Sequence, residues 1–223
     1  MSTTKLGENE MSTYFKAVRP DGTDFRTGTI DYAAALGGEP VTLPMVPGPR
    51  CCTSDVLHAS TVPTETLVGG SWPCRLLEVT GTPVAQDRHK RGFFSLTVVR
   101  EVDAHQALGP QGEQVAALID RAGKLTVDES EKLDAAGVAA GDAAWVAAEY
   151  AARDAAWNAA RDAAWVAAEN AARVAARYAA GDAALALVVR DIITKEHYDL
   201  LTGPWAQAIG SAHPDDPTRE DTP

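Results

Sequence analysis

Between residues 135 and 184, pairs of adjacent alanines recur at every fourth position, thirteen times in all. Alanine has the highest helix propensity of any residue, so this repeat predicts α-helix. Four residues advance about 400° around a helix, so each pair lies about 40° beyond the previous one. The seam of small side chains therefore winds around the helix. Because four exceeds the natural 3.6 residues per turn, a partner that follows the seam must wrap in the right-handed sense.

Aromatic residues lie inside this repeat. Trp145, Trp157 and Trp165 are separated by about 120° and then about 80° around a straight helix, so no single face holds all three. Three exposed tryptophans would form an unusual apolar patch on a monomer. We therefore expect them, together with Tyr150, to bind a protein partner or a second copy of the chain. Charged residues interrupt every window long enough to cross a bilayer, which argues against a membrane span.

Glycines leave the length of the helix open. The pairs Gly141-Asp142 and Gly181-Asp182 predict a helix end followed by an N-cap aspartate. Without a break, the helix from Asp142 to Ala180 would be roughly 58 Å long. The alternatives are one long helix and several packed helices.

The chain has 223 residues and a net charge of −11, which is unevenly distributed. Residues 11–105 carry nine basic and ten acidic residues, whereas residues 106–223 carry ten and nineteen. The excess of negative charge argues against nucleic acid as the main ligand. No apolar segment of the signal-peptide kind is present near the N-terminus, so we expect a reducing cytoplasm.

The composition divides the chain into five parts. We expect disorder in residues 1–10, a β-rich domain in 11–105, an acidic helical linker in 106–134, the alanine-rich helical region in 135–210 and a disordered tail in 211–223. The predicted fold class is α+β: a small β-rich N-terminal domain followed by a long alanine-rich helical region.

Local patterns predict individual elements. Strands are expected at residues 14–19, 56–59, 75–80 and 93–102, and a further strand near 24–31 would form a hairpin with the first across Pro20-Asp21-Gly22. Residues 63–67 predict a helical turn with proline near its start. A capping box from Thr126 to Glu129 begins one helix, and Thr194 caps another that ends near Gly203-Pro204-Trp205.

One stretch of residues resembles a known family. The run from Cys51 to Ser60, CysCysThrSerAspValLeuHisAlaSer, is followed by Pro63, Leu67, the segment ArgLeuLeuGluVal at 75–79, and Lys90. Over about residues 13–103, this pattern resembles an uncharacterised domain family of actinobacteria and their phages. The resemblance implies such an origin, with the host cytoplasm as the location of a phage-encoded chain. It implies no activity, and no site residue follows from it.

Cysteine and histidine raise the question of a metal or thiol site. Cys51, Cys52, His58, Cys74 and His89 carry the ligand types that zinc prefers. Adjacent cysteines rarely both reach one ion, however, and the sequence has no CxxC pair. A nucleophilic thiol beside His58 would need an oriented base, which proximity in sequence does not supply. We therefore expect small buried thiols, a hydrogen-bonded histidine and no cofactor.

A nucleotide pocket is a further hypothesis. The order of Arg19 after a first strand, the polar segment His58-Ala59-Ser60-Thr61 and a later strand carboxylate, Glu78 or Glu101, is similar to that of ADP-ribosyltransferase-like domains. That similarity implies a nicotinamide dinucleotide as ligand. We nevertheless expect a non-enzymatic interaction or assembly protein, because the helical repeat is the most strongly specified feature; an ADP-ribosyltransferase-like domain fused to a helical module is the alternative.

Overall fold

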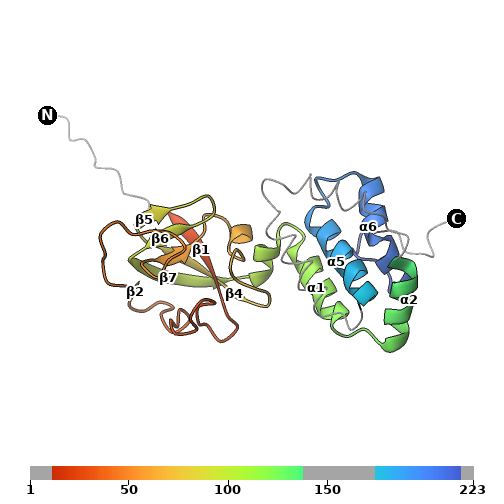
Figure 1. Ribbon diagram of the computed structural model, residues 1–223, viewed down its shortest axis with the longest axis horizontal. Helices are drawn as coiled ribbons and strands as arrows, with labels where there is room; N and C mark the ends of the chain where they lie inside the picture. Colours follow the sequence, from red (N-terminus) through yellow and green to blue (C-terminus); the bar gives the residue numbers. More distant parts are fainter. Residues whose placement is uncertain (1–11, 138–173, 217–223) are drawn as a thin grey trace.

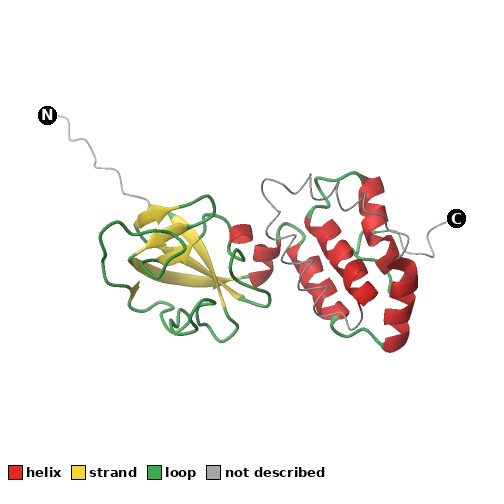
Figure 2. Ribbon diagram, viewed as in Figure 1, coloured by secondary structure: helices red, strands yellow, loops and turns green. Residues whose placement is uncertain are grey.

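The computed structural model describes residues 12–137 and 174–216. Strands occupy the first part of the chain and α-helices the second, side by side along the longest axis (Figure 1, Figure 2). The predicted mixed α+β class is therefore confirmed. Most of the alanine repeat lies outside the described residues, and with it the expected contact residues Trp145, Tyr150, Trp157 and Trp165.

The strands form two antiparallel sheets. The larger has the order β1-β4-β7-β2, with β1 at Thr13–Val18, β4 at Arg75–Thr80, β7 at Ser95–Val102 and β2 at Val41–Thr42. The smaller has the order β3-β6-β5, with β3 at Leu57–Ala59, β6 at Arg91–Phe93 and β5 at Pro83–Gln86. The first, third and fourth main strand predictions correspond to β1, β4 and β7, and residues 56–59 contain β3. The short strands β2, β5 and β6 were not predicted.

One pair of residues links the backbones of the two sheets, and beyond it β1 and β3 separate. Phe15 of β1 and Ser60, just after β3, exchange both backbone hydrogen bonds at 2.8 Å. In a regular antiparallel ladder the next such pair would be Ala17 and His58. Instead, the carbonyl of His58 accepts a hydrogen bond of 2.9 Å from Lys16 Nζ. The separation of β1 from β3 opens a cleft between the sheets.

Side chains alternate across the larger sheet and enter two cores. Tyr14, Val18 and Leu77 belong to a core cluster shared with the smaller sheet. On the opposite face, Ala17 and Leu76 belong to a second cluster that continues into the helices. The larger sheet is therefore covered on both faces.

The helical part follows a short 3₁₀ connection, η2, at Ala104–Leu108, and it contains α1 at Gly112–Ala122, α2 at Val127–Gly137, α5 at Val174–Val188 and α6 at Lys195–Ala208. Helix α5 contacts α1, α2 and α6. From Ala179 onward its alanines are almost completely buried, with Ala180, Ala183 and Ala184 at 0% exposure. Small side chains at these positions allow close approach of the neighbouring helices. No helix in the described ranges has the length and apolar character needed to cross a bilayer.

The predicted strand at residues 24–31 is wrong, because this segment is a loop. The carboxylate of Asp24 accepts hydrogen bonds from the backbone N–H groups of Thr27, Thr29 and Ile30 at 2.6–3.1 Å, and from the Thr27 hydroxyl at 2.7 Å. The backbone therefore bends around the Asp24 side chain, and its N–H groups are not available for hydrogen bonds to a neighbouring strand. Only the single bridge between Thr23 and Asp31 retains hairpin geometry.

Two predicted helix ends are also wrong. Helix α5 continues through Gly181-Asp182, because the neighbouring alanines are packed in the core. Asp182 is therefore inside the helix, and burial raises the pKa of its carboxyl group to about 6. Helix α6 continues through Pro204 to Ala208, because Trp205 is buried in the core at 3% exposure. Tertiary packing outweighs the helix-breaking tendencies of glycine and proline here.

Three local predictions in the same part of the chain are confirmed. The Thr126 hydroxyl accepts from Glu129 N–H at 3.2 Å, and the Glu129 carboxylate accepts from Thr126 N–H at 2.9 Å, which is a complete capping box before α2. Thr194 accepts from His197 N–H at 3.3 Å at the start of α6. The helical turn η1, at Pro63–Glu65, begins with Pro63.

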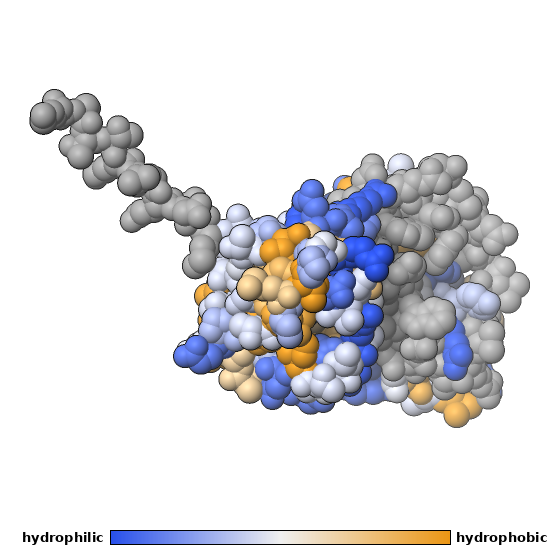
Figure 3. Space-filling view, turned by 60° about the vertical axis from the view of Figure 1, so that its left-hand side comes forward, coloured by the Kyte–Doolittle hydropathy of each residue, from blue (hydrophilic) through white to orange (hydrophobic). Residues whose placement is uncertain are grey.

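The outer surface of the strand-rich part carries some large apolar side chains. Met45 is 84% exposed, and Leu36, Val84 and Val99 are each at least 40% exposed. Figure 3 shows apolar side chains gathered between strongly hydrophilic ones on one face. Exposed apolar side chains in such numbers are common in folded proteins, so we assign them no function.

Candidate functional site

A cleft with a volume of about 600 Å³ lies between the two sheets. It is lined by β1, the loop at residues 24–32, the turn at 52–54, β3 and the segment 66–70. Its volume is in the range typical of small-molecule sites. The cleft therefore brings together segments that are far apart in the sequence.

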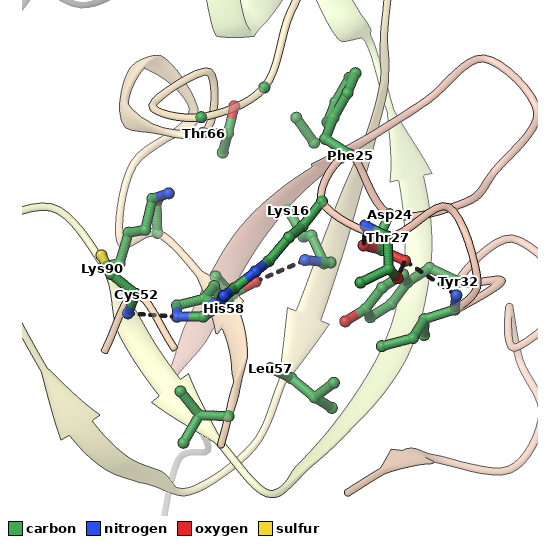
Figure 4. A pocket seen from close by; sticks show the side chains of 18 of the residues that line it. Lys16, Asp24, Phe25, Thr27, Tyr32, Cys52, Leu57, His58, Thr66 and Lys90 are labelled. Atoms are coloured by element: carbon green, nitrogen blue, oxygen red, sulfur yellow. Dashed lines mark hydrogen bonds between the residues drawn. The ribbon is translucent and has the colours of Figure 1, made fainter. Parts of the chain in front are cut away.

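Lys16 lies near the middle of the cleft, between Asp24 and Tyr32 on one side and His58 on the other (Figure 4). Lys16 is on the same face of β1 as Tyr14 and Val18, because side chains alternate along a strand. These two neighbours are 7% and 0% exposed, so this face is turned to the apolar core. The ammonium group lies 4.4 Å from the centre of the Tyr32 ring. A lysine is therefore placed where the strand pattern calls for an apolar residue.

The surroundings of Lys16 disfavour its charge. Burial lowers the pKa of Lys16 to about 8; Asp24 opposes this effect and Lys90 adds to it. The amine of Lys16 is thus neutral in a substantial fraction of molecules under mildly alkaline conditions.

His58 is held in one tautomer by the turn before β3. Its Nε2 accepts a hydrogen bond of 2.8 Å from the backbone N–H of Cys52, so the proton of the neutral ring is on Nδ1. Cys52 adopts a left-handed conformation with φ of 64°, which is uncommon for a residue with a side chain. Burial, together with Lys16 and Lys90, lowers the pKa of His58 to about 4, so the ring is neutral at pH 7.

The charged groups that line the cleft are mainly basic. Lys16, Arg26 and Lys90 contribute three cations, and Asp24 is the carboxylate among the lining residues. Burial alone would raise the pKa of Asp24, but hydrogen bonds from its own loop outweigh this and hold the pKa well below its usual range. Those bonds also occupy the carboxylate oxygens, so Asp24 is directed to its loop. The cleft therefore has an excess of positive charge.

Aromatic rings and hydroxyl groups complete the lining. Phe15, Phe25 and Tyr32 contribute rings, and Ser60 and Thr66 lie on the walls. Gly69 leaves space beside Lys90, since a Cβ atom there would lie 3.4 Å from Lys90 Nζ. Such a site can hold a flat ring and an acidic group at the same time.

Only some of the residues of the nucleotide-pocket hypothesis line the cleft. His58 and Ser60 line the cleft. Arg19 is not among the lining residues, and its guanidinium donates a hydrogen bond of 3.0 Å to the Phe25 carbonyl. Glu78 and Glu101 do not line the cleft, because each forms a 2.6 Å ion pair between β4 and β7, Glu78 with Arg100 and Glu101 with Arg75.

The zinc candidates are also separated. Cys52 Sγ contacts the Asp87 carboxylate at 3.4 Å, and this hydrogen bond is the main cause of its raised thiol pKa. Cys74 is in the core, where burial raises its pKa to about 12, and His89 Nδ1 lies 3.1 Å from a Glu65 oxygen. Cys51 has a thiol pKa raised chiefly by burial. Within residues 12–137 and 174–216, no three histidine, cysteine or acidic side chains gather in a way that fits a metal ion.

Sequence reasoning missed Lys16, Asp24 and Tyr32. The sequence did carry a signal for Lys16. Tyr14, Lys16 and Val18 share one face of β1, and lysine is the charged residue between two apolar ones on that face. Asp24 and Tyr32 gave no comparable signal, since their roles depend on the path of the loop.

Comparison of the chain with protein-family models, with curated proteins and with solved structures finds no match. The geometry of the cleft is therefore the main basis for a functional assignment. Its cations, its rings and its neutral histidine suit the binding of an anionic small molecule.

Proposed function

We propose that the strand-rich part is a binding module for a small anionic ligand, and that the alanine-rich part mediates protein–protein interaction or assembly. The ligand class is a flat ring that carries a phosphate or carboxylate group. The observation that carries this proposal is the charge of the cleft: Lys16, Arg26 and Lys90 line it, against one lining carboxylate, Asp24. An anion would be attracted by this excess of positive charge.

Binding by the full chain can be tested by calorimetry with inorganic phosphate, AMP, ADP and NAD. We expect the ring-containing anions to bind, and the affinity to fall as salt is added. Replacing Lys90 by methionine should weaken binding by about tenfold or more, because a charge-assisted contact is lost. The matched control is Lys124→Met. Lys124 follows the end of α1 and forms an exposed ion pair with Asp120 of that helix. Equal affinities of Lys90→Met and the native chain, or no binding by any of the four anions, would contradict the proposal.

An ADP-ribosyltransferase-like, NAD-binding domain is the second candidate. It is supported by the presence of both His58 and Ser60 on the cleft wall. The positions of Glu78 and Glu101 in ion pairs are unfavourable to it, since the catalytic carboxylate that the resemblance implies would have to lie beside the ligand. Release of nicotinamide from NAD by the native chain, and its loss in Glu78→Gln or Glu101→Gln, would favour this candidate over simple binding.

The interaction part of the proposal is based on the alanine repeat, with Trp145, Tyr150, Trp157 and Trp165 as contact residues in a long helical region. Sedimentation of the full chain and of a variant with the three tryptophans changed to alanine tests it. We expect self-association, or capture of a partner, in the native chain only. The resemblance of residues 13–103 to an actinobacterial and phage family is compatible with either candidate for the strand-rich part.

A further inference from the structure

Lys16 combines features that are unusual for a lysine. It occupies an inward position between Tyr14 and Val18, and its ammonium group reaches the cleft instead of the outer surface. It approaches the face of the Tyr32 ring at 4.4 Å and the His58 carbonyl at 2.9 Å. The amine is therefore fixed in position inside a cavity that is large enough for a ligand.

Its chemistry differs from that of a surface lysine. A lysine amine is nucleophilic only when it is neutral, and a desolvated site beside another cation increases the neutral fraction. Lys16 has both conditions, because it is half-buried at the cleft, where desolvation lowers its pKa, and Lys90 lowers the pKa further. Asp24 opposes this lowering, but desolvation is the larger effect, and the pKa of Lys16 stays near 8.

We propose that Lys16 Nζ forms a reversible imine with the aldehyde or ketone group of an anionic ligand held in the cleft. This inference rests on the proposed binding of a ring-containing anion and adds the reacting group. In the reaction the amine nitrogen forms a bond to the carbonyl carbon. Both hydrogens of the neutral amine then leave with the carbonyl oxygen as one molecule of water, and a carbon–nitrogen double bond remains.

A purely structural role for Lys16 is the competing explanation. At the point where β1 and β3 separate, its ammonium group replaces the missing ladder partner of the His58 carbonyl. A lysine with only this role would stay protonated and would show no selective reaction with carbonyl compounds. The two roles therefore predict different reactivity.

Pyridoxal 5′-phosphate is a suitable probe, because it joins an aldehyde, a ring and a phosphate. The full chain is incubated with the probe, the imine is reduced with borohydride, and the modified lysines are located by mass spectrometry. We expect Lys16 to react about tenfold or more faster than the exposed lysines Lys124 and Lys195, with a pH profile centred near 8. Lys16→Arg should abolish this rapid phase while the far-ultraviolet circular dichroism stays unchanged.

A parallel reaction with pyridoxal, which lacks the phosphate, separates this inference from the proposed anion binding. Rapid labelling of Lys16 by both compounds at equal rates would support the imine and contradict the anion site. Tight, reversible binding of pyridoxal 5′-phosphate without an adduct on Lys16 would support the anion site and overturn the imine. Uniform labelling of all lysines, or labelling of Lys90 alone, would overturn the imine as well. If Lys16→Arg does not fold, Lys16→Met at the same readout replaces it.

Discussion

At the residue scale, the shape of the cleft depends on side chains that form hydrogen bonds with backbone groups. The Lys16 ammonium group and the Asp24 carboxylate each bind backbone atoms where regular strand pairing stops. His58 has a similar role toward the N–H of Cys52. The residues that line the cleft are thus also residues that supply hydrogen-bond partners to the backbone, which couples the shape of the cleft to the stability of the fold.

Protonation of His58 should destabilise the fold. The folded state keeps the ring neutral down to pH of about 4, whereas the unfolded chain takes up the proton near pH 6.5. Between these values the unfolded state binds more protons, so the free energy of unfolding must decrease as the pH falls through this window. We expect a loss of about 2 kcal/mol between pH 7 and pH 5, which is the upper part of this window. Urea unfolding at pH 7, 6 and 5 measures it, and His58→Gln should give a flatter profile. Parallel profiles for the two chains would contradict the assignment.

Removing the Asp24 side chain should open the loop at residues 24–32. Asp24→Ala leaves three buried or partly buried N–H groups and one hydroxyl without their acceptor, and we expect a loss of about 3 kcal/mol in the free energy of unfolding. Asp24→Asn should lose less, because the amide retains one accepting oxygen. Chemical denaturation compares the two variants. Equal losses for alanine and asparagine would show that the carboxylate oxygens do not hold the loop as described.

At the element scale, local signals predicted some features and failed for others. The capping box of α2 and the cap of α6 were predictable because their hydrogen bonds join residues three positions apart. The loop after Asp24 was not predicted, because one carboxylate accepts from several N–H groups at once, and the passage of α6 through Pro204 was not, because burial of Trp205 decides it. The cleft itself follows from the separation of β1 and β3, which no local pattern records.

The N-terminal cap of α2 is open to a direct test. Thr126→Ala removes the hydroxyl that accepts from Glu129 N–H, and we expect a loss of about 1 kcal/mol in the free energy of unfolding. Thr126→Ser keeps the acceptor and serves as the control, with a smaller change. Thermal unfolding of the three chains checks the prediction, which fails if serine and alanine are equally destabilising.

At the scale of the whole molecule, one core cluster connects the sheet to the helices. Leu76 of β4 and Leu108 of η2 belong to the same cluster as Leu118 of α1 and Leu187 of α5. Leu76, Leu108 and Leu187 are 0% exposed. A sheet and a helical part that share a core in this way should unfold together.

Truncation of the Leu108 side chain tests whether the sheet and the helices unfold together. Leu108→Ala leaves a cavity at the connection between the two parts, and we expect a loss of about 3 kcal/mol. Circular dichroism at far-ultraviolet wavelengths follows mainly the helices, and labelling of the Cys74 thiol follows exposure of the region before β4. Both signals should shift to lower denaturant concentration by the same amount. A helical signal that persists after Cys74 has become reactive would show that the parts are independent.

The short outer strands have a consequence for association between molecules. β2 has two residues and β5 begins with a proline, so neither offers a long row of free backbone groups to a neighbouring chain. Strand-to-strand addition, the usual route by which β proteins aggregate, is thereby blunted at these borders. A contact between two copies of the chain at either of these borders must therefore depend on side chains more than on backbone pairing.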